Sequence, residues 1–327
     1  MEIKGKFFAV GHGLTYAFKI DSFHVLFDIK KNCDFDELRD FYGNKNIDIL
    51  VISHFDTDHS DGIQELYKQG FTMKRIYIPY IDDDEKLVLE LMFLYFNRDY
   101  NSEREALGNT EIIEVRELEI YKTDFWEFNI HNSKEKEKRK VTGKVTGTPS
   151  ADVAKIIKSL NAIGITTKDD VRRNLKAKQD DIKAAYKNVK GDLNLTSLFM
   201  EHGPIDEKSI KESTYSGLEF KSKKVKKGKN DYVHSLITGD CNLLNNKSVI
   251  KGYLNKLGYV LVPHHSGLKE WDDYICQDTD KVVWIVTISQ IKSRPYGQVV
   301  SDIYSNNEEL YICDKTKFFE YELISII

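Results

Sequence analysis

The chain alternates between short apolar segments and turn-forming residues over most of its length. Near the N-terminus, apolar segments at 3–10, 14–20 and 23–28 are separated by Gly and Asp, which is typical of a strand meander. Similar segments predict strands at 47–53, 75–80, 124–132, 194–202, 232–240, 259–263, 281–289 and 309–314. Helices are expected after the strand at 47–53, ending at Gly70, and near 84–97 behind a run of acids. This pattern predicts a mixed α/β fold.

The pattern changes between Ser133 and Gly191. A charged, Gly- and Thr-bearing linker is followed by a segment in which apolar residues recur at helical spacing. These residues are Val153, Ile156, Ile157, Leu160, Val171, Leu175, Ile182, Tyr186 and Val189, and Thr167 with Asp170 resembles a capping box. We interpret 133–191 as an inserted linker and helical subdomain between two halves of one domain, 1–132 and 192–327.

Composition narrows the class of protein. The chain has 327 residues, of which 41% are hydrophobic, so it can bury the core of an α/β domain with an insertion. The formal net charge of −4 gives no global attraction to nucleic acid or anionic lipid. Its 4 cysteines lie far apart, which argues for reduced thiols and against a disulfide framework or thiolate metal site. No segment approaches the ~18 apolar residues of a membrane span. We expect a cytoplasmic protein that has no membrane partner.

The segment "HFDTDH", from His54 to His59, directly follows the apolar strand at 47–53. Residues just beyond the carboxyl end of a buried strand face the crevice where α/β proteins bind ligands. Imidazole and carboxylate are ligands for divalent transition metals, and this spacing lets side chains of one tight loop converge. The alternative is a solvated acidic turn in which both histidines are capping or core groups.

Two later strands also end in metal-ligating residue types. Asp240 ends the strand at 232–240 within "TGD", and His264 with His265 follow the strand at 259–263. A carboxylate in this position is able to bridge two cations. Taken singly, such a Gly-Asp is usually a turn and such a His pair a hydrogen-bonded group. Three clusters at strand ends together predict a metal centre.

These motifs resemble those of the metallo-β-lactamase-fold hydrolases, and most closely the domain found in DNA-uptake (ComEC-type competence) proteins. The resemblance is carried by "HFDTDH", by "VGHG" at 10–13, by a strand ending in Asp28, and by "PHHSG" at 263–267. "NLTSLFM" before the "TGD" strand also matches, as does "SRPYGQV", which has Gln298 where the family usually has His. The resemblance implies a four-layered αββα sandwich.

The resemblance also implies a ligand set for two divalent metal ions. His54 and Asp56 would hold the first ion, Asp58 and His59 the second, and Asp240 would bridge them, with His265 completing the second. A third histidine of the first site is missing, and Asn194 stands nearest to its expected place. His202 and His234 are possible substitutes, although ordinary structural roles are favoured for both. Fewer imidazoles shift the preference from Zn²⁺ toward Mn²⁺.

Two such ions would activate a bridging hydroxide for hydrolysis. Asp58 would ligate and orient this hydroxide, and His264 or Tyr296 would donate a proton to the oxyanion or leaving group. Neither an organic cofactor nor a nucleophilic Ser or Cys is required.

Local positive charge points to a polyanionic substrate. Lysines cluster at Lys221–Lys229, on a hairpin assigned to the strand that ends in Asp240, and Lys and Arg outnumber acids in the insertion. A phosphodiesterase, most simply a nuclease, is therefore the leading hypothesis. The alternatives are a hydrolase of small esters, lactones or β-lactams, and a non-catalytic metal-stabilised module whose insertion binds a protein partner. Lysines that only keep a sheet edge soluble would favour these alternatives.

Overall fold

The computed structural model describes 1–80, 110–134, 158–165, 170, 181, 196–217, 220–226, 233–277, 282–287, 297–306 and 309–325. The chain forms two compact units, the first made of 1–79, 109–135 and 196–327, and the second of 80–108 and 136–195. In the second unit 158–162 are helical, and Leu160 and Ile165 are buried. Asp170 is also helical. The other helical positions predicted for the insertion, and the whole of the helix predicted near 84–97, lie outside the described residues.

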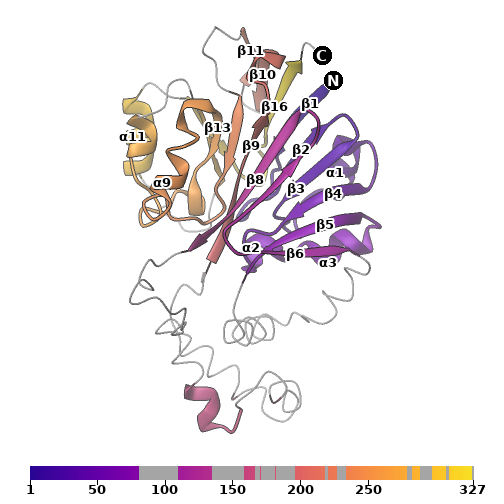
Figure 1. The fold of residues 1–327 in the computed structure, drawn as a ribbon, viewed down its shortest axis with the longest axis vertical. Coiled ribbons are helices and arrows are strands. Elements are labelled where there is room, and N and C mark those ends of the chain that lie inside the picture. The colour runs from indigo at the N-terminus through magenta and orange to yellow at the C-terminus, as the bar shows by residue number, and fades with distance from the viewer. Residues whose placement is uncertain are drawn as a thin grey trace. The chain divides into compact units, whose positions relative to one another are not determined.

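Within the described residues, the first unit contains two mixed β-sheets (Figure 1). The larger sheet has nine strands in the order β11 (Phe220–Lys226), β10 (Ile210–Gly217), β16 (Phe319–Ser325), β1 (Glu2–Phe7), β2 (Tyr16–Ile20), β3 (Phe23–Phe27), β4 (Asn46–Val51), β5 (Thr72–Pro79) and β6 (Glu111–Val115). The smaller sheet has seven strands in the order β15 (Glu309–Cys313), β14 (Val283–Thr287), β13 (Leu257–Leu261), β12 (His234–Ile237), β9 (Thr196–Pro204), β8 (Trp126–Lys134) and β7 (Leu118–Lys122).

Helices lie on the outer faces of both sheets. Figure 1 shows α1 (Phe35–Tyr42) and α3 (Ile63–Lys68) beside the larger sheet and α9 (Lys247–Ile250) and α11 (Gly297–Ser305) beside the smaller. The short helix α2 (Thr57–Ser60) follows β4, and α10 (Tyr274–Gln277) contributes to the apolar cluster of the smaller sheet. Short 3₁₀ turns are η2 (Glu207–Ser209), η3 (Leu254–Lys256) and η4 (Pro263–His265).

Capping residues at both ends of α1 explain where this helix begins and ends. The Asp34 carboxylate accepts from two backbone N–H groups of the first turn, and Gly43, with φ of 77°, closes the last.

An apolar core fills the space between the two sheets. Phe18 on β2 lies 5.2 Å from Trp126 on β8 between ring centroids, and Tyr321 on β16 stacks on Tyr259 of β13 at 4.0 Å. A second apolar cluster joins the smaller sheet to its helices through residues such as Ile250 and Ile303. These packed layers confirm the predicted four-layered αββα sandwich.

The sequence pattern found most but not all of the strands. It missed β6, β7, β10 and β16, whose residues alternate with charged or exposed positions. The assignment of the lysine-rich segment to the strand that ends in Asp240 was wrong. Lys221 to Lys226 belong to β11, which pairs with β10 at the edge of the larger sheet, whereas the strand leading to Asp240 begins at His234 in the smaller sheet. The register of this hairpin places Lys226 opposite Glu212.

Strand direction brings the functional loops to one edge of the sandwich. β3, β4 and β5 are parallel, and β1 runs in the same direction because it is antiparallel to β2, which is antiparallel to β3. β12, β13 and β14 are likewise parallel in the smaller sheet. The loops after β1, β4, β12 and β13 therefore leave the carboxyl ends of their strands, where ligand sites form.

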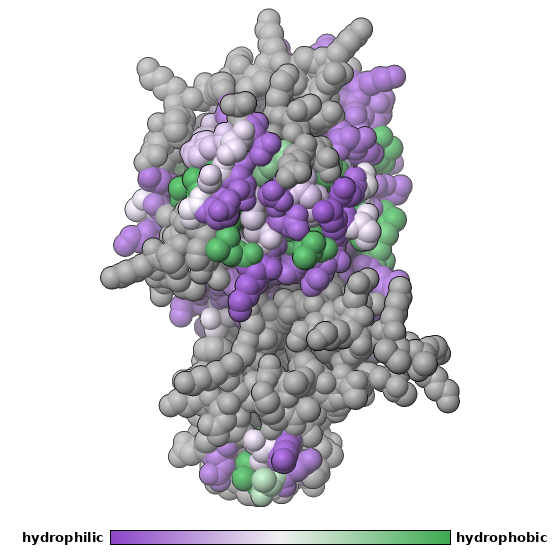
Figure 2. All heavy atoms as spheres, turned by 90° about the vertical axis from the view of Figure 1, so that its left-hand side faces the viewer, coloured by the Kyte–Doolittle hydropathy of each residue, from purple (hydrophilic) through white to green (hydrophobic). Residues whose placement is uncertain are grey.

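The described surface on the α9 and α11 side is mainly hydrophilic, with separate hydrophobic spots (Figure 2). Among the described residues, no helix has the length and apolar composition needed to cross a membrane.

His202 lies in the core between the sheets and is fully buried. Its Nδ1 accepts from Trp126 Nε1 at 3.1 Å, so the neutral ring carries its proton on Nε2, which donates to the Tyr16 hydroxyl at 2.9 Å. Tyr16 continues the chain to Tyr321 at 2.6 Å. Burial lowers the pKa of His202 well below its ordinary value. His202 is therefore a neutral core group.

We predict that His202→Leu lowers the free energy of unfolding by about 1–3 kcal/mol at pH 7, because it leaves the Trp126 donor buried without its acceptor. Below pH ~6.5 the unfolded wild-type chain takes up a proton on His202 that the folded protein does not, so wild-type stability falls with decreasing pH. In the variant, this dependence should weaken by up to about 1.4 kcal/mol per pH unit. Urea unfolding between pH 4 and 8 measures both effects, and parallel pH profiles for the two proteins would contradict a buried neutral His202.

Candidate metal centre

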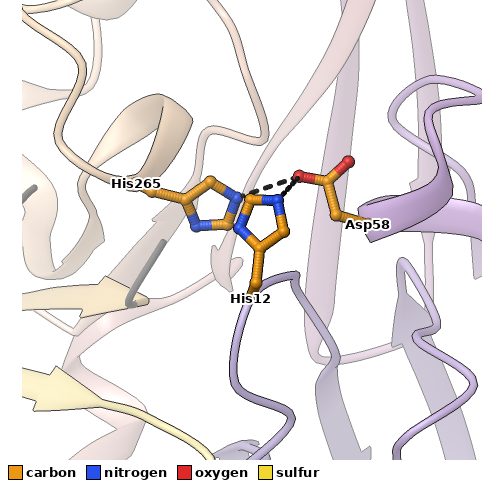
Figure 3. A group of neighbouring side chains, drawn as sticks. All are labelled: His12, Asp58 and His265. Carbon is orange, nitrogen blue, oxygen red and sulfur yellow. Dashed lines mark hydrogen bonds and ion pairs between the residues drawn. The ribbon is translucent and has the colours of Figure 1, made fainter. Parts of the chain in front are cut away.

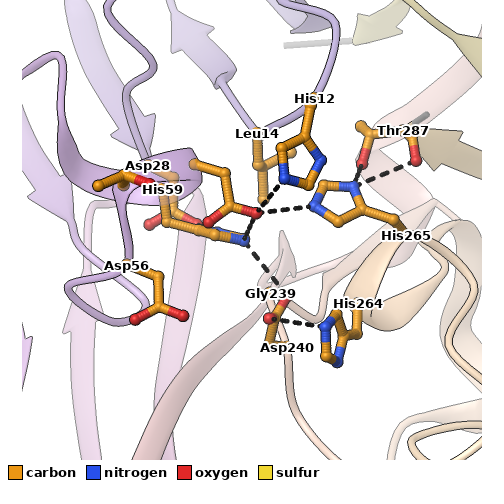
Figure 4. A network of polar contacts seen from close by, with 12 residues as sticks. His12, Leu14, Asp28, Asp56, His59, Gly239, Asp240, His264, His265 and Thr287 are labelled. Carbon is orange, nitrogen blue, oxygen red and sulfur yellow. Dashed lines mark hydrogen bonds and ion pairs between the residues drawn. The ribbon is translucent and has the colours of Figure 1, made fainter. Parts of the chain in front are cut away.

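Six of the residues predicted to bind metal lie together at one edge of the sandwich (Figure 4). They are His54, Asp56, Asp58, His59, Asp240 and His265. The first four belong to the loop and short helix that follow β4 in the larger sheet. Asp240 follows β12 and His265 follows β13 in the smaller sheet. Each sheet thus contributes part of the group.

The buried carboxylate of Asp28 fixes the loop after β4. It accepts from the backbone N–H of Ser53 at 2.7 Å, from the Ser53 hydroxyl at 2.7 Å and from His59 Nδ1 at 2.6 Å. Asp28 itself has a φ of 55°, a left-handed conformation that an L-residue adopts only when its surroundings hold it. Asp28, at the end of β3, therefore sets the positions of Ser53 and His59 together.

Ile29 and Lys30, just after β3, hold the other side of this loop. Lys30 Nζ donates to the carbonyl of Thr57 at 2.8 Å and pairs with Asp61 at 2.7 Å. The N–H of Gly62 donates to the carbonyl of Ile29 at 2.9 Å. A Cβ on Gly62 would lie within 2.8 Å of the backbone of that segment, so glycine is required for this close approach.

The loops of the smaller sheet also pack closely against Ser53. Gly239 has φ of 52°, and a Cβ there would lie 2.9 Å from the Ser53 Cβ. His264, His265 and Ser266 all have positive φ, between 47° and 65°. Three consecutive non-glycine residues in this region indicate strain, which proteins retain mainly at functional sites.

Hydrogen bonds fix the tautomers of three imidazoles. The Ser53 hydroxyl donates to Asp28, so it accepts from His54 Nδ1 at 2.9 Å. His59 Nδ1 donates to Asp28, and His265 Nδ1 donates to Thr287 Oγ1 at 2.8 Å. With Nδ1 protonated, each neutral ring presents an Nε2 lone pair to the site, as metal-ligating histidines do.

The two oxygens of Asp240 face different histidines. Oδ2 lies 3.6 Å from His54 Nε2 and 3.7 Å from His264 Nε2, and Oδ1 lies 3.3 Å from His59 Nε2. On its other side, His264 Nδ1 lies 3.3 Å from the buried Glu270 carboxylate. Asp240 therefore lies between two groups of potential ligands, the arrangement expected of a bridging carboxylate.

The Asp58 carboxylate lies close to a further set of imidazoles (Figure 3). Its Oδ2 lies 3.3 Å from His265 Nε2 and 3.4 Å from His12 Nε2, and it lies 3.8 Å from His59 Nε2. Sequence reasoning did not name His12 as a site residue, although it lies inside the "VGHG" motif between β1 and β2. The one available signal was a histidine between two glycines directly after a strand.

Opposite charges stabilise one another across the site. Burial alone would raise the pKa of Asp58 and of Asp240, yet His59 and the other neighbouring imidazoles hold both below their ordinary range. Burial alone would lower the pKa of His59, but Asp240, Asp58 and Asp28 raise it well above its ordinary value. A cation held by the same atoms would take over the role of these protons.

The donor set fits divalent metal ions. Nε2 of His54 and Nε2 of His59 are buried and have no hydrogen-bond partner among the described residues. Ligand atoms at about 2.0–2.1 Å from a tetrahedral ion lie about 3.3–3.4 Å apart, close to the shortest N···O separations seen here. Three overlapping groups have ligand atoms within 4.8 Å of one another, namely His54 with His59 and Asp240, His54 with Asp56 and Asp58, and His12 with Asp58 and His265.

Other candidates lie elsewhere. His202 uses both ring nitrogens in the core, and His234, at the opposite end of β12 from Asp240, pairs with Glu201. Gln298 is exposed on α11 and donates to Asp302 one turn away at 2.6 Å. Asn194 and Tyr296 lie outside the described residues, so their predicted roles stay predictions.

No protein-family model matches the chain, and no curated protein matches it. Among solved structures, the long form of RNase Z from yeast is 13% identical with a TM-score of 0.40, over 88% of this chain and 37% of that one. A mutant of CmlA beta-hydroxylase is 13% identical with a TM-score of 0.44, over 96% of this chain and 46% of that one. The metallo-beta-lactamase fold protein YhfI from Bacillus subtilis is 16% identical with a TM-score of 0.27, over 39% of this chain and 53% of that one.

The chain spans less than half the length of the first two structures. None of the three is described as a DNA-uptake protein, and the resemblance to that branch stays a prediction.

We predict that Asp28→Asn weakens the binding of divalent metal about 10–100-fold, because an amide cannot hold Ser53 and His59 in the same way. The matched control is Asp21→Asn, since Asp21 also has a positive φ, of 47°, but lies in the turn between β2 and β3. Competition with a chromophoric chelator measures the affinities. Equal affinities for the two variants would show that Asp28 does not position the ligands.

Proposed function

We propose that this chain is a metal-dependent hydrolase that holds two divalent cations and cleaves phosphodiesters. The observation that carries the proposal is the position of Asp240, whose oxygens face His54 on one side and His59 on the other. A carboxylate in this position would link two neighbouring cation sites. The residues that would fill those sites come from both sheets, so the folded sandwich is needed to assemble them.

The first cation would be held by His54, Asp56 and Oδ2 of Asp240. His54 Nε2 lies 3.9 Å from an oxygen of Asp56 and 3.6 Å from Asp240. One imidazole with two carboxylates is an oxygen-rich set that favours Mn²⁺ over Zn²⁺. The second cation would be held by Asp58, His59, His265 and Oδ1 of Asp240, a set richer in nitrogen that suits Zn²⁺.

Cations bound here would supply a nucleophilic water at neutral pH and polarise the phosphoryl oxygens. The chain's own residues would do the rest. The Asp58 side chain is 17% exposed, and its carboxylate is suited to orient a water by accepting its hydrogen bond. His264 is suited to donate a proton to the leaving oxygen, because its Nε2 faces Asp240 while Glu270 holds its other nitrogen. Its side chain is 18% exposed, so it contacts both the site and the solvent.

The lysines of β11 support a polyanionic substrate. Lys221, Lys223, Lys224 and Lys226 fall on an edge strand of the larger sheet, and Lys227 and Lys229 lie outside the described residues. Such a cluster binds nucleic acid through release of counterions. A hydrolase of small esters, lactones or β-lactams would make no use of these lysines.

We predict that Asp240→Asn loses at least one of two bound metal ions and most of the hydrolytic activity, because the amide cannot neutralise two cations. The control Asp206→Asn changes an exposed capping aspartate on the loop after β9. Metal content by mass spectrometry and turnover of bis(p-nitrophenyl) phosphate in Mn²⁺, Zn²⁺ and Mg²⁺ provide the measurements. Full turnover in the Asp240 variant would reject the bridge. A wild-type protein that binds two ions but hydrolyses nothing would favour a non-catalytic module.

We predict that replacing the six lysines between 221 and 229 by Gln weakens cleavage of single- and double-stranded DNA or RNA and flattens its dependence on salt. Turnover of the small phosphodiester should stay unchanged, because these lysines lie outside the ligand set. Cleavage assayed from 50 to 300 mM salt separates the two effects. Equal salt dependence in the variant and the wild type would remove the support that the lysines give to a polynucleotide substrate.

A further inference from the structure

His12 has no role in the ligand set proposed above, yet its ring points at that set. It lies in the loop between β1 and β2, and Figure 3 shows its ring beside Asp58 and His265. We propose that His12 is a further ligand of the cation held by Asp58 and His265. This inference rests on the proposed metal centre and adds to it a residue from the loop after β1.

The spacing of three atoms carries the inference. Nε2 of His12 and Nε2 of His265 lie 3.4 and 3.3 Å from the same oxygen of Asp58 (Figure 3). Both values fall within the range of about 2.8–3.6 Å expected between ligand atoms that lie about 2.0–2.1 Å from a five-coordinate ion. The two rings have centroids 5.0 Å apart and are tilted by 43°, so they do not stack on one another. Both imidazoles thus converge on one point beside Asp58.

The backbone places His12 over Asp58. The N–H of Leu14 donates to the carbonyl of Asp58 at 3.0 Å, which ties the loop after β1 to the metal loop. Gly11 and Gly13 have φ of 71° and 136°, conformations that L side chains rarely adopt. A Cβ on Gly13 would lie 2.5 Å from the Asp58 carbonyl oxygen. Two glycines therefore allow the contact that directs the histidine between them into the site.

No other described group accounts for the orientation of His12. Its Nδ1 is buried without a hydrogen-bond partner among the described residues, and its side chain is only 30% exposed. A histidine that served only solubility or capping would expose a ring nitrogen to solvent or hydrogen-bond it to the backbone. Here the nitrogen that has a neighbour faces the shared oxygen of Asp58.

The two cation sites would then differ in strength. The second would have three imidazoles, from His12, His59 and His265, and the first only the imidazole of His54. Nitrogen-rich sites bind Zn²⁺ and Co²⁺ more tightly than oxygen-rich ones. One ion should therefore remain bound under conditions in which the other exchanges.

The test compares His12→Ala with the matched control His131→Ala. His131 lies on β8, bonds the Tyr253 hydroxyl and is outside the site. Both variants and the wild type are loaded with Co²⁺. Mass spectrometry gives the number of ions bound, and chelator competition gives the dissociation constant of the tighter one. His12→Ala should raise that constant by at least about tenfold while the control leaves it unchanged. Thermal unfolding of the metal-free proteins checks that both variants fold.

A second measurement does not depend on any variant. In crystals of the wild type loaded with Co²⁺, anomalous diffraction should place an ion about 2.0–2.3 Å from Nε2 of His12. An ion beside Asp58 and His265 but more than about 3 Å from His12, or an unchanged dissociation constant in His12→Ala, would overturn the inference alone. A wild-type protein that binds no Co²⁺ would instead overturn the proposed metal centre.

Discussion

The carboxylate of Asp28 is the group on which the site depends most directly. It is fully buried, and three donors from the loop after β4 satisfy it. Leaving a carboxylate buried without such partners would cost several kcal/mol, so the loop and the end of β3 are held in one relative position. The consequence reaches both histidines of the "HFDTDH" segment, because Ser53 holds His54 and Asp28 holds His59.

The sandwich completes what this loop begins. The larger sheet presents His54, Asp58 and His59, and the smaller sheet presents Asp240 and His265 through turns after parallel strands. The N–H of Leu198 on β9 donates to the carbonyl of Ser53 at 2.8 Å, and Gly239 packs on the same serine. Ser53 is thus the point where the sheets meet beside the site. The apolar core sets the distance between the two sheets. The contacts of Leu198 and Gly239 with Ser53 then fix where the ligands of one sheet lie relative to those of the other.

The sequence was most informative where an apolar strand pattern is followed directly by metal-ligating residue types. An apolar strand ending in closely spaced His and Asp residues predicted the loop after β4, and the same reasoning found Asp240 and His265. His12 was not predicted, because it is a single histidine after a strand. Only the order of pairing, β1 with β2, β2 with β3 and β3 with β4, shows that the loop after β1 lies at the same edge of the sheet as the loop after β4. Thr287 and Glu270, which orient His265 and His264, carry no local signal at all, since their role arises from packing after β13 and β14. The edge strands β6 and β7 were missed because exposed edges lack the apolar runs that mark a buried strand.

Charge explains why these groups tolerate burial together. The carboxylates of Asp58 and Asp240 lie among imidazoles, which hold the pKa of both below its ordinary range, while these carboxylates raise the pKa of His59. Replacing protons by two cations preserves this balance and also uses the Nε2 atoms of His54 and His59, which have no other partner among the described residues. A purely structural network would have been expected to satisfy those nitrogens with hydrogen bonds. A hydrogen bond orients Nδ1 of His54, His59 and His265, while Nε2 of His54 and of His59 has no hydrogen-bond partner among the described residues. In this the cluster differs from His202 in the core, whose two ring nitrogens both form hydrogen bonds.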